Sequence, residues 1–310
     1  MHLTGPLYNV PEDSNIQNMI QKLLIELVML LSVAFAGPGG KDSGVPAGQP
    51  YECTDCHGDL LEPAVRHYPA EDGCENCHEP TGASHPSDSL GFRLMDRVPA
   101  LCFYCHDEPE TPAHTHYPVT SGECLGCHDA HASAQASLMR LPEPGLCLSC
   151  HSRNYRSDSS ATANIGRLVA GNMMPHSAIE GGGCSSCHQA HGSDFRALLV
   201  DRFPEPQYVP AVVDSFALCF LCHDTDLLEA EETQWGTGFR DGQRNLHWLH
   251  INGSKGRNCR MCHDLHGSPQ PFLIREQLEF GNWEMQMNFV PGEQGGSCLP
   301  GCHGKLSYQR

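Results

Sequence analysis

The longest apolar run of the chain lies near its N-terminus, at residues 23–36 (LLIELVMLLSVAFA). The run follows Lys22 and ends in small residues before Gly37, an order typical of a secretory signal peptide with its cleavage site. It is short and contains Glu26, which argues against a transmembrane helix. An uncleaved amphipathic anchor is the alternative. We therefore expect an exported protein, periplasmic or extracellular at the cell surface, with no stable membrane span.

The same run suggests how the chain is divided. Residues 1–36 are assigned to the signal peptide, residues 37–52 to a Gly/Pro-rich linker and residues 53–310 to the working part of the chain. The 18 residues ahead of Met19 are unusual for a signal peptide, so we expect Met19 to be the true start.

Hydrophobic periodicity is weak beyond the linker. Residues 130–141 and 193–200 allow a short helical turn or two, whereas residues 203–210 form a Pro-rich loop. The polar residues 152–164 and the acidic residues 224–232 indicate excursions on the surface. The expected fold is mostly irregular, with loops and short α-helices.

Composition explains why regular structure is sparse. Hydrophobic residues make up 39% of the chain and include 18 cysteines, beside 31 glycines and 23 prolines. Too few aliphatic residues remain for a large core, so something other than side chains must fill the interior. The formal charge of −18 excludes nucleic acid and anionic membrane surfaces as default partners.

All the cysteines belong to one repeated motif. Eight times the pattern is Cys-x-x-Cys-His, and a ninth copy has one extra residue between its cysteines. The cysteines are Cys53, Cys56, Cys74, Cys77, Cys102, Cys105, Cys124, Cys127, Cys147, Cys150, Cys184, Cys187, Cys219, Cys222, Cys259, Cys262, Cys298 and Cys302. The histidines that follow are His57, His78, His106, His128, His151, His188, His223, His263 and His303.

This spacing is typical of c-type haem attachment, in which two thiols bond covalently to haem and the adjacent histidine is the proximal iron ligand. Zinc ribbons also use paired cysteines, but a zinc site has no reason to require histidine after every pair. A disulfide framework fits an exported protein but not this pattern. In the ninth motif residues 299–301 must loop outward to keep both thiols in reach, and we expect haem there too. The sequence thus predicts nine covalently bound haem c groups.

Ten further histidines lie beyond the predicted leader and are the candidates for the distal iron ligands. They are His67, His85, His114, His116, His131, His176, His191, His247, His250 and His266. Nine six-coordinate irons need nine such ligands, so His114 or His247 is the expected spare. Methionine is an alternative sixth ligand, with Met139, Met173 and Met174 the nearest candidates. A hydrogen-bonding role is the alternative for the histidines.

The motifs are arranged as an internal repeat. Each unit holds two motifs and begins with a histidine seven to nine positions ahead of the first cysteine. We define unit one as residues 67–106, unit two as 116–151, unit three as 176–223 and unit four as 250–303. The lone motif at 53–57 resembles the second half of a truncated leading unit. The expected architecture is an elongated array in which haems replace the hydrophobic core.

Spacing within a unit restricts the ligand pairs. His128 and His131 are three residues apart and would project from one face of a helix. Two ligands of one iron must approach from opposite faces of the porphyrin. His131, His191 and His266 are therefore expected to bind a different haem from their neighbour, which forces haems close together.

The pattern Cys-x-x-Cys-His-x-x-His-Gly-Ser occurs at residues 184–193 and 259–268, with Ala132 in place of glycine in unit two. In this feature the chain resembles the multihaem c-type cytochromes built from doubled Cys-x-x-Cys-His motifs. The resemblance implies mostly two-histidine ligation, low reduction potential and transfer of single electrons in respiratory or extracellular electron transfer. Its members include periplasmic shuttles, components of outer-membrane conduits and filament-forming cytochromes.

Two classes of function follow. The first is an electron-transfer protein without catalytic residues, whose partners are other redox proteins or copies of itself in a head-to-tail filament. The alternative is a multihaem reductase of a small oxyanion or nitrogen oxide, which needs one open iron. Such enzymes often carry lysine as the proximal ligand, and no Cys-x-x-Cys-Lys occurs in the chain.

Overall fold

The computed structural model describes residues 52–88, 90–156, 161–170 and 173–310. The chain divides into two units of contacts, Met1–Glu52 and Cys53–Arg310, and the elements below belong to the second. The predicted signal peptide, the start at Met19 and the linker up to residue 51 lie outside the described residues. Among the helices that the structure describes, none has the length and apolar character needed to cross a bilayer.

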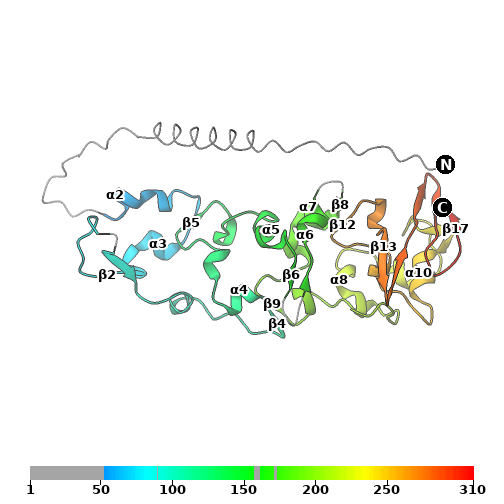
Figure 1. Ribbon diagram of the computed structural model, residues 1–310, viewed down its shortest axis with the longest axis horizontal. Helices are drawn as coiled ribbons and strands as arrows, with labels where there is room; N and C mark the ends of the chain where they lie inside the picture. Colours follow the sequence, from blue (N-terminus) through cyan, green and yellow to red (C-terminus); the bar gives the residue numbers. More distant parts are fainter. Residues whose placement is uncertain (1–51, 89, 157–160, 171–172) are drawn as a thin grey trace, which may run out of the picture. The chain divides into compact units, whose positions relative to one another are not determined.

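The helices are short, as Figure 1 shows. They are α2 (Thr54–His57), α3 (Tyr68–Asp72), α4 (Tyr117–Thr120), α5 (Gly145–His151), α6 (Ile165–Val169), α7 (Ser177–Gly182), α8 (Ala217–Phe220), α9 (Asp226–Glu229) and α10 (Leu246–Ile251). Five of the motifs open instead in single 3-10 turns, at Cys74–Asn76, Cys102–Tyr104, Cys124–Gly126, Cys184–Ser186 and Cys259–Met261.

The strands form small antiparallel sheets. Two-residue strands are β1 (Val65–Arg66), β4 (His114–Thr115), β5 (Ala132–Ser133), β6 (Tyr155–Arg156), β7 (Ala161–Thr162), β8 (Met174–Pro175), β9 (Gly192–Ser193), β10 (Arg240–Asp241), β11 (Arg244–Asn245) and β12 (Gly267–Ser268). Longer strands are β2 (His78–Pro80), β3 (Phe92–Leu94), β13 (Gln277–Phe280), β14 (Trp283–Gln286), β15 (Val290–Gly292), β16 (Gly295–Cys298) and β17 (Leu306–Gln309). The predicted loop-rich fold with short helices is confirmed.

One backbone hydrogen bond recurs across the motifs. In six of them the histidine N–H donates to the carbonyl of the first cysteine four residues earlier, at 3.0 Å: His57, His106, His128, His188, His223 and His263. This bond closes one helical turn. The turn carries both cysteines and the histidine, so each of these six motifs forms a helical turn of its own.

Three strand pairs join segments far apart in the sequence. β1 pairs with β5, β4 with β9 and β8 with β12, all antiparallel. We call these pairs the crossings. Each joins the segment ahead of one predicted unit to the middle of the next. Directly after the first strand, the N–H of His67, His116 or His176 donates to the carbonyl of His131, His191 or His266, at 2.8, 3.2 and 3.3 Å respectively.

The hydrophobic core is small. Its cluster of buried residues consists of Val209, Phe216, Leu228 and Ile251. The acidic segment 224–232 was expected to be a surface excursion, and its five acidic residues are exposed, although Leu228 is buried. Within it α9 buries Leu228 in the core, because the charged residues occupy only the other side of this short helix.

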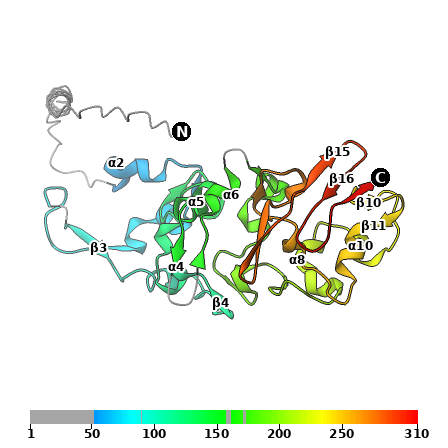
Figure 2. The same cartoon turned by 45° about the vertical axis from the view of Figure 1, so that its right-hand side comes forward.

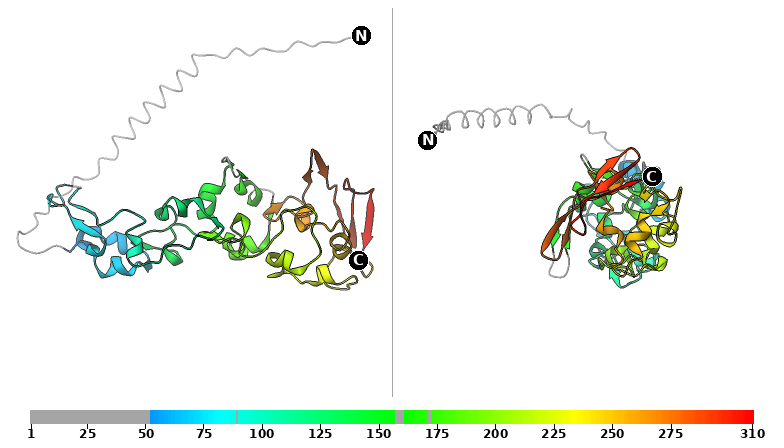
Figure 3. Two further views of the ribbon diagram at one scale, coloured as in Figure 1. Left: turned by 90° about the horizontal axis from the view of Figure 1, so that it is seen from below. Right: turned by 90° about the vertical axis from the view of Figure 1, so that its right-hand side faces the viewer.

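Two further features differ from the expected elements. The helical turns expected at 130–141 and 193–200 are single 3-10 turns, Ala136–Leu138 and Arg196–Leu198, and each contains positive φ angles. The strands after residue 276 were not predicted. There β13 and β14 form a hairpin and β15, β16 and β17 a sheet, seen in red-brown in Figure 3. Figure 2 shows β10, β11 and α10 beside this sheet, and the Gly242 N–H donates to the Gln309 carbonyl at 2.6 Å.

Candidate haem-binding sites

Every motif histidine faces one other histidine. The nine ring pairs have centroid separations of 6.0 to 6.4 Å. They are His57–His85, His106–His67, His78–His131, His151–His116, His128–His191, His223–His176, His188–His266, His263–His247 and His303–His250. Each pair joins one histidine of a motif to one outside the motifs.

The separation fits a metal ion between the two rings. A bond of about 2.0 Å from metal to imidazole nitrogen, with about 1.1 Å from nitrogen to ring centre, gives about 6.2 Å for two opposed ligands. Rings in van der Waals contact face to face would be closer than this. The pairs could therefore hold iron with one histidine on each side.

The second ring nitrogen supports the same interpretation, because metal-ligating histidines usually donate their other N–H to a fixed acceptor. Nδ1 lies 2.9 Å from the Ala130 carbonyl in His67 and 3.0 Å from the Ala190 carbonyl in His116. In motif histidines the acceptors are the carbonyls of Ser137 for His128 (2.9 Å), Ala197 for His188 (2.8 Å) and Phe272 for His263 (2.9 Å). These contacts leave Nε2 for a metal.

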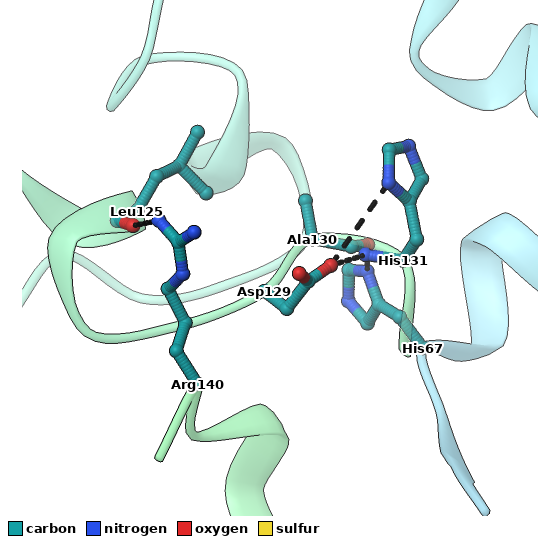
Figure 4. Close-up of polar contacts among 6 residues, drawn as sticks. All are labelled: His67, Leu125, Asp129, Ala130, His131 and Arg140. Atoms are coloured by element: carbon teal, nitrogen blue, oxygen red, sulfur yellow. Dashed lines mark hydrogen bonds and ion pairs between the residues drawn. The ribbon is translucent and has the colours of Figure 1, made fainter. Parts of the chain in front are cut away.

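Figure 4 shows how a crossing brings two such histidines together. The His67 ring contacts the Ala130 carbonyl, and the N–H of His131 donates to Oδ1 of Asp129 at 2.9 Å. His67 pairs with His106 of its own unit, whereas His131 pairs with His78 of unit one rather than with His128. One crossing thus holds candidate ligands of two different sites.

The same exchange occurs at each crossing. His78 of unit one faces His131 of unit two, His128 of unit two faces His191 of unit three, and His188 of unit three faces His266 of unit four. Each unit also contains one internal pair, namely His67–His106, His116–His151, His176–His223 and His250–His303. Neighbouring units are therefore tied together at the candidate ligands themselves.

Unit four begins in a helix, α10, whereas each earlier unit is preceded by the first strand of a crossing. His247 and His250 both lie on α10 and face His263 and His303. Asn245, buried with 1% of its surface exposed, caps this helix. Its Oδ1 accepts from the N–H of His247 at 3.0 Å, and its Nδ2 donates to the Ala230 carbonyl at 2.8 Å.

A strained turn follows the first motif of units two, three and four. Ser137 and Leu138, Ala197 and Leu198, and Phe272 and Leu273 all have φ between 54° and 60°. Each such non-glycine residue costs about 1–2 kcal/mol. The first residue of every pair supplies the carbonyl that accepts from the motif histidine. The strained turn is thus conformationally unfavourable, but it places a carbonyl oxygen within hydrogen-bonding distance of Nδ1 of the motif histidine.

A buried serine closes each of these turns. The hydroxyls of Ser133, Ser193 and Ser268 donate to the carbonyls of Met139, Leu199 and Ile274. The same oxygens accept from the N–H of Gln135, Phe195 and Gln270 at 2.9 to 3.0 Å. The sequence reasoning missed this role, although the recurring serine of His-Gly-Ser was its signal.

Thiols of consecutive motifs also meet. The first cysteines of neighbouring motifs interact at three places, Cys53 with Cys74, Cys147 with Cys184 and Cys219 with Cys259. The 18 cysteines all lie in the described residues and all are free. Groups attached to such neighbouring thiols would lie side by side.

A lowered pKa favours metal ligation at eight of the eighteen paired histidines. Burial lowers the pKa of His247 to about 4. Burial also lowers the pKa of other members of the pairs: His78, His116, His151, His176, His250, His263 and His266. These imidazoles are neutral at pH 7, and the neutral form is the one that binds metals.

The remaining candidates are placed differently. His114 lies exposed on β4 and has no ring partner in the part of the chain that the structure describes. Met139 contributes its backbone carbonyl to Ser133, and the Met174 side chain is 41% exposed. The insert of the ninth motif passes close to β14. A Cβ added to Gly301 would lie only 1.8 Å from the Trp283 ring.

Comparison with known proteins agrees with the motif geometry. The doubled CXXCH motif family matches the chain three times, at residues 67–111, 116–155 and 176–227. The multiheme cytochrome MtrA of Shewanella baltica (strain OS185) is 30% identical over 149 residues, which cover 46% of this chain and 43% of that protein. The alignment thus spans less than half of either protein. Three consecutive family matches, a multihaem relative and the histidine pairs on the motifs identify the chain as a multihaem c-type cytochrome of the doubled CXXCH motif family.

Proposed function

We propose that the chain is an exported nonahaem cytochrome that conducts single electrons along closely spaced haems. Each motif would bind one haem through its two cysteines, with the motif histidine as proximal ligand and its ring partner as distal ligand. The observation that carries the proposal is the set of nine pairs, each separated by about the width of a bis-imidazole metal site. His114 has no place in this scheme.

Haem supplies reversible one-electron chemistry at its iron. The chain would contribute by fixing the distances between neighbouring haems. A crossing sets two distal ligands of different haems at one point, and the first cysteines of some neighbouring motifs, such as Cys147 and Cys184, lie close together. Rigid spacing matters because electron tunnelling weakens steeply with distance.

We infer that other redox proteins are the partners. The charge of −18, to which haem propionates would add, favours a partner that docks through a basic patch. Electron-transfer rates measured against ionic strength test this, since electrostatic docking is slowed by salt. Rates independent of salt would contradict it. Electron microscopy of native material separates a shuttle or conduit component from a head-to-tail filament subunit.

The number of haems and the state of their irons test the main proposal. The mass of the purified protein should exceed that of the processed chain by nine increments of about 0.6 kDa. The reduced protein should show the sharp visible bands of a ferrous cytochrome and should not bind carbon monoxide. Fewer increments would contradict the count, and carbon monoxide binding would favour the alternative reductase with one open iron.

A further inference from the structure

Three of the nine motif histidines share a second layer of contacts that the sequence repeat alone does not explain. His128, His188 and His263 each donate from Nδ1 to the carbonyl of a residue nine positions later, at 2.8 to 2.9 Å. That residue has a left-handed conformation in all three cases. The same strained conformation at three equivalent positions indicates that the orientation of the carbonyl is functionally important.

The buried serines hold these carbonyls in place. Ser193 is 3% exposed, and its hydroxyl joins the N–H of Phe195 to the carbonyl of Leu199. These two contacts bracket Ala197, the residue whose carbonyl faces His188. Ser133 and Ser268 bracket Ser137 and Phe272 in the same way.

Unit one lacks this strained turn and its buried serine. Its first motif is followed by Glu79 and Pro80, and Ala83 stands where the later units carry serine. His78 pairs with Leu94 in the β2–β3 hairpin, a backbone pairing that the later units keep as isolated bridges, so the missing feature is the serine and its turn. Unit one therefore lacks the contact that holds Nδ1 of the first-motif histidine in units two, three and four.

We propose that Ser133, Ser193 and Ser268 are positioning residues that lower the reduction potential of the haems ligated by His128, His188 and His263. This rests on the haem ligation proposed above. A fixed acceptor at Nδ1 makes the imidazole a stronger donor. A stronger axial donor stabilises ferric iron and lowers the potential. Units two, three and four then carry matched low-potential haems, and unit one does not.

Redox titration of the holoprotein with Ser193→Ala tests the proposal. The substitution removes the hydroxyl that brackets the turn, so about one ninth of the visible absorbance change should move to a more positive potential. Ser121→Ala is the matched control. Its hydroxyl also donates to a backbone carbonyl, that of Tyr117, but no motif histidine depends on it. The control should titrate like the parent protein.

A second pair of variants alters the turn at Ala197, whose carbonyl faces His188, and leaves Ser193 unchanged. Ala197 is exposed and has φ of 57°, a conformation that glycine tolerates and β-branched residues resist. Ala197→Val should shift the same fraction positively, and Ala197→Gly should leave it unchanged. Unshifted titrations for both Ser193→Ala and Ala197→Val, with full haem mass, would overturn the proposal. A parent protein without haem mass would overturn the proposed function instead, before any titration.

Discussion

Two histidines in one short segment show what distinguishes a candidate ligand from a spare. His116 has its Nδ1 3.0 Å from the Ala190 carbonyl and its ring 6.1 Å from that of His151. His114, two residues earlier, is exposed and contributes only backbone pairing with Ser193. The two residues lie in different elements, since His114 is the first residue of β4 whereas His116 follows the strand at the N-cap position of α4.

We predict that His116→Ala opens one iron and His114→Ala opens none. Loss of His116 removes the partner of His151, so about one haem in nine should become high-spin and bind carbon monoxide when reduced. Visible spectra of the reduced protein with and without carbon monoxide measure this. Carbon monoxide binding in the His114 variant, or none in the His116 variant, would refute the assignment.

Asn245 is expected to support two sites at once. Asn245→Ala removes the cap of α10 and leaves the buried Ala230 carbonyl without its donor, which should lower the free energy of unfolding by about 2–4 kcal/mol. Denaturant unfolding measures the loss. Asn164→Ala removes a cap from α6, which carries no paired histidine, and should cost only about 1 kcal/mol. Equal losses in the two variants would argue against a special role for Asn245.

At the scale of elements, the crossings determine which histidines meet. A two-residue strand pair has little stability of its own in water. Each crossing is instead reinforced by the backbone bond from one histidine to the next unit and by the ring contacts beside it. The crossings therefore depend on close approach of backbones, which limits side chains at their centres.

Glycine at the crossings should be required to different degrees. A Cβ on Gly267 would lie 2.0 Å from the Leu168 carbonyl, whereas a Cβ on Gly192 would meet the Pro112 ring at 2.7 Å. We predict that Gly267→Ala lowers the free energy of unfolding by about 1–3 kcal/mol or more. Gly192→Ala should cost less, because alanine already occupies the equivalent position, Ala132, in unit two. Denaturant unfolding followed by haem absorbance compares the variants, and a larger loss for Gly192→Ala would contradict the ranking.

The elements also show how far the sequence leads. The motif cysteines and histidines can be read directly, because attachment chemistry fixes their local spacing. The partners of His57 and His263 could not be predicted, since no other unit has a histidine at the position of His85 or of His247. The β13–β14 hairpin was missed although polar and apolar residues alternate in both of its strands, QLEF and WEMQ, on either side of Gly281 and Asn282.

For the whole molecule, packing of side chains provides little of the cohesion. Nine hydrophobic side chains are buried in the described part of the chain: Ala132, Leu146, Val209, Phe216, Leu228, Ile251, Met261, Met285 and Met287. Most of them lie after residue 208, so the earlier units have almost no core of their own. Covalently held groups must supply the interior contacts there.

We therefore predict that the chain made without haem does not fold cooperatively. Scanning calorimetry of haem-free protein should show no sharp transition, whereas the holoprotein should melt cooperatively. Far-ultraviolet circular dichroism, which does not depend on haem absorbance, serves as the second measurement. A cooperative melt of the haem-free chain would show that the side chains suffice.

The crossings have one more implication, for how arrays of this kind can grow. Each of the three crossings has the same pair of two-residue strands, and at each one a histidine of one unit pairs with a histidine of the next. A second copy of residues 114–173, inserted after residue 173, would carry its own β4 and β5. It could form one crossing with the unit before it and one with the unit after it, so each paired histidine would still have a partner. Lengthening by whole modules is thus compatible with the structure, whereas adding a single motif would leave an iron without its second histidine.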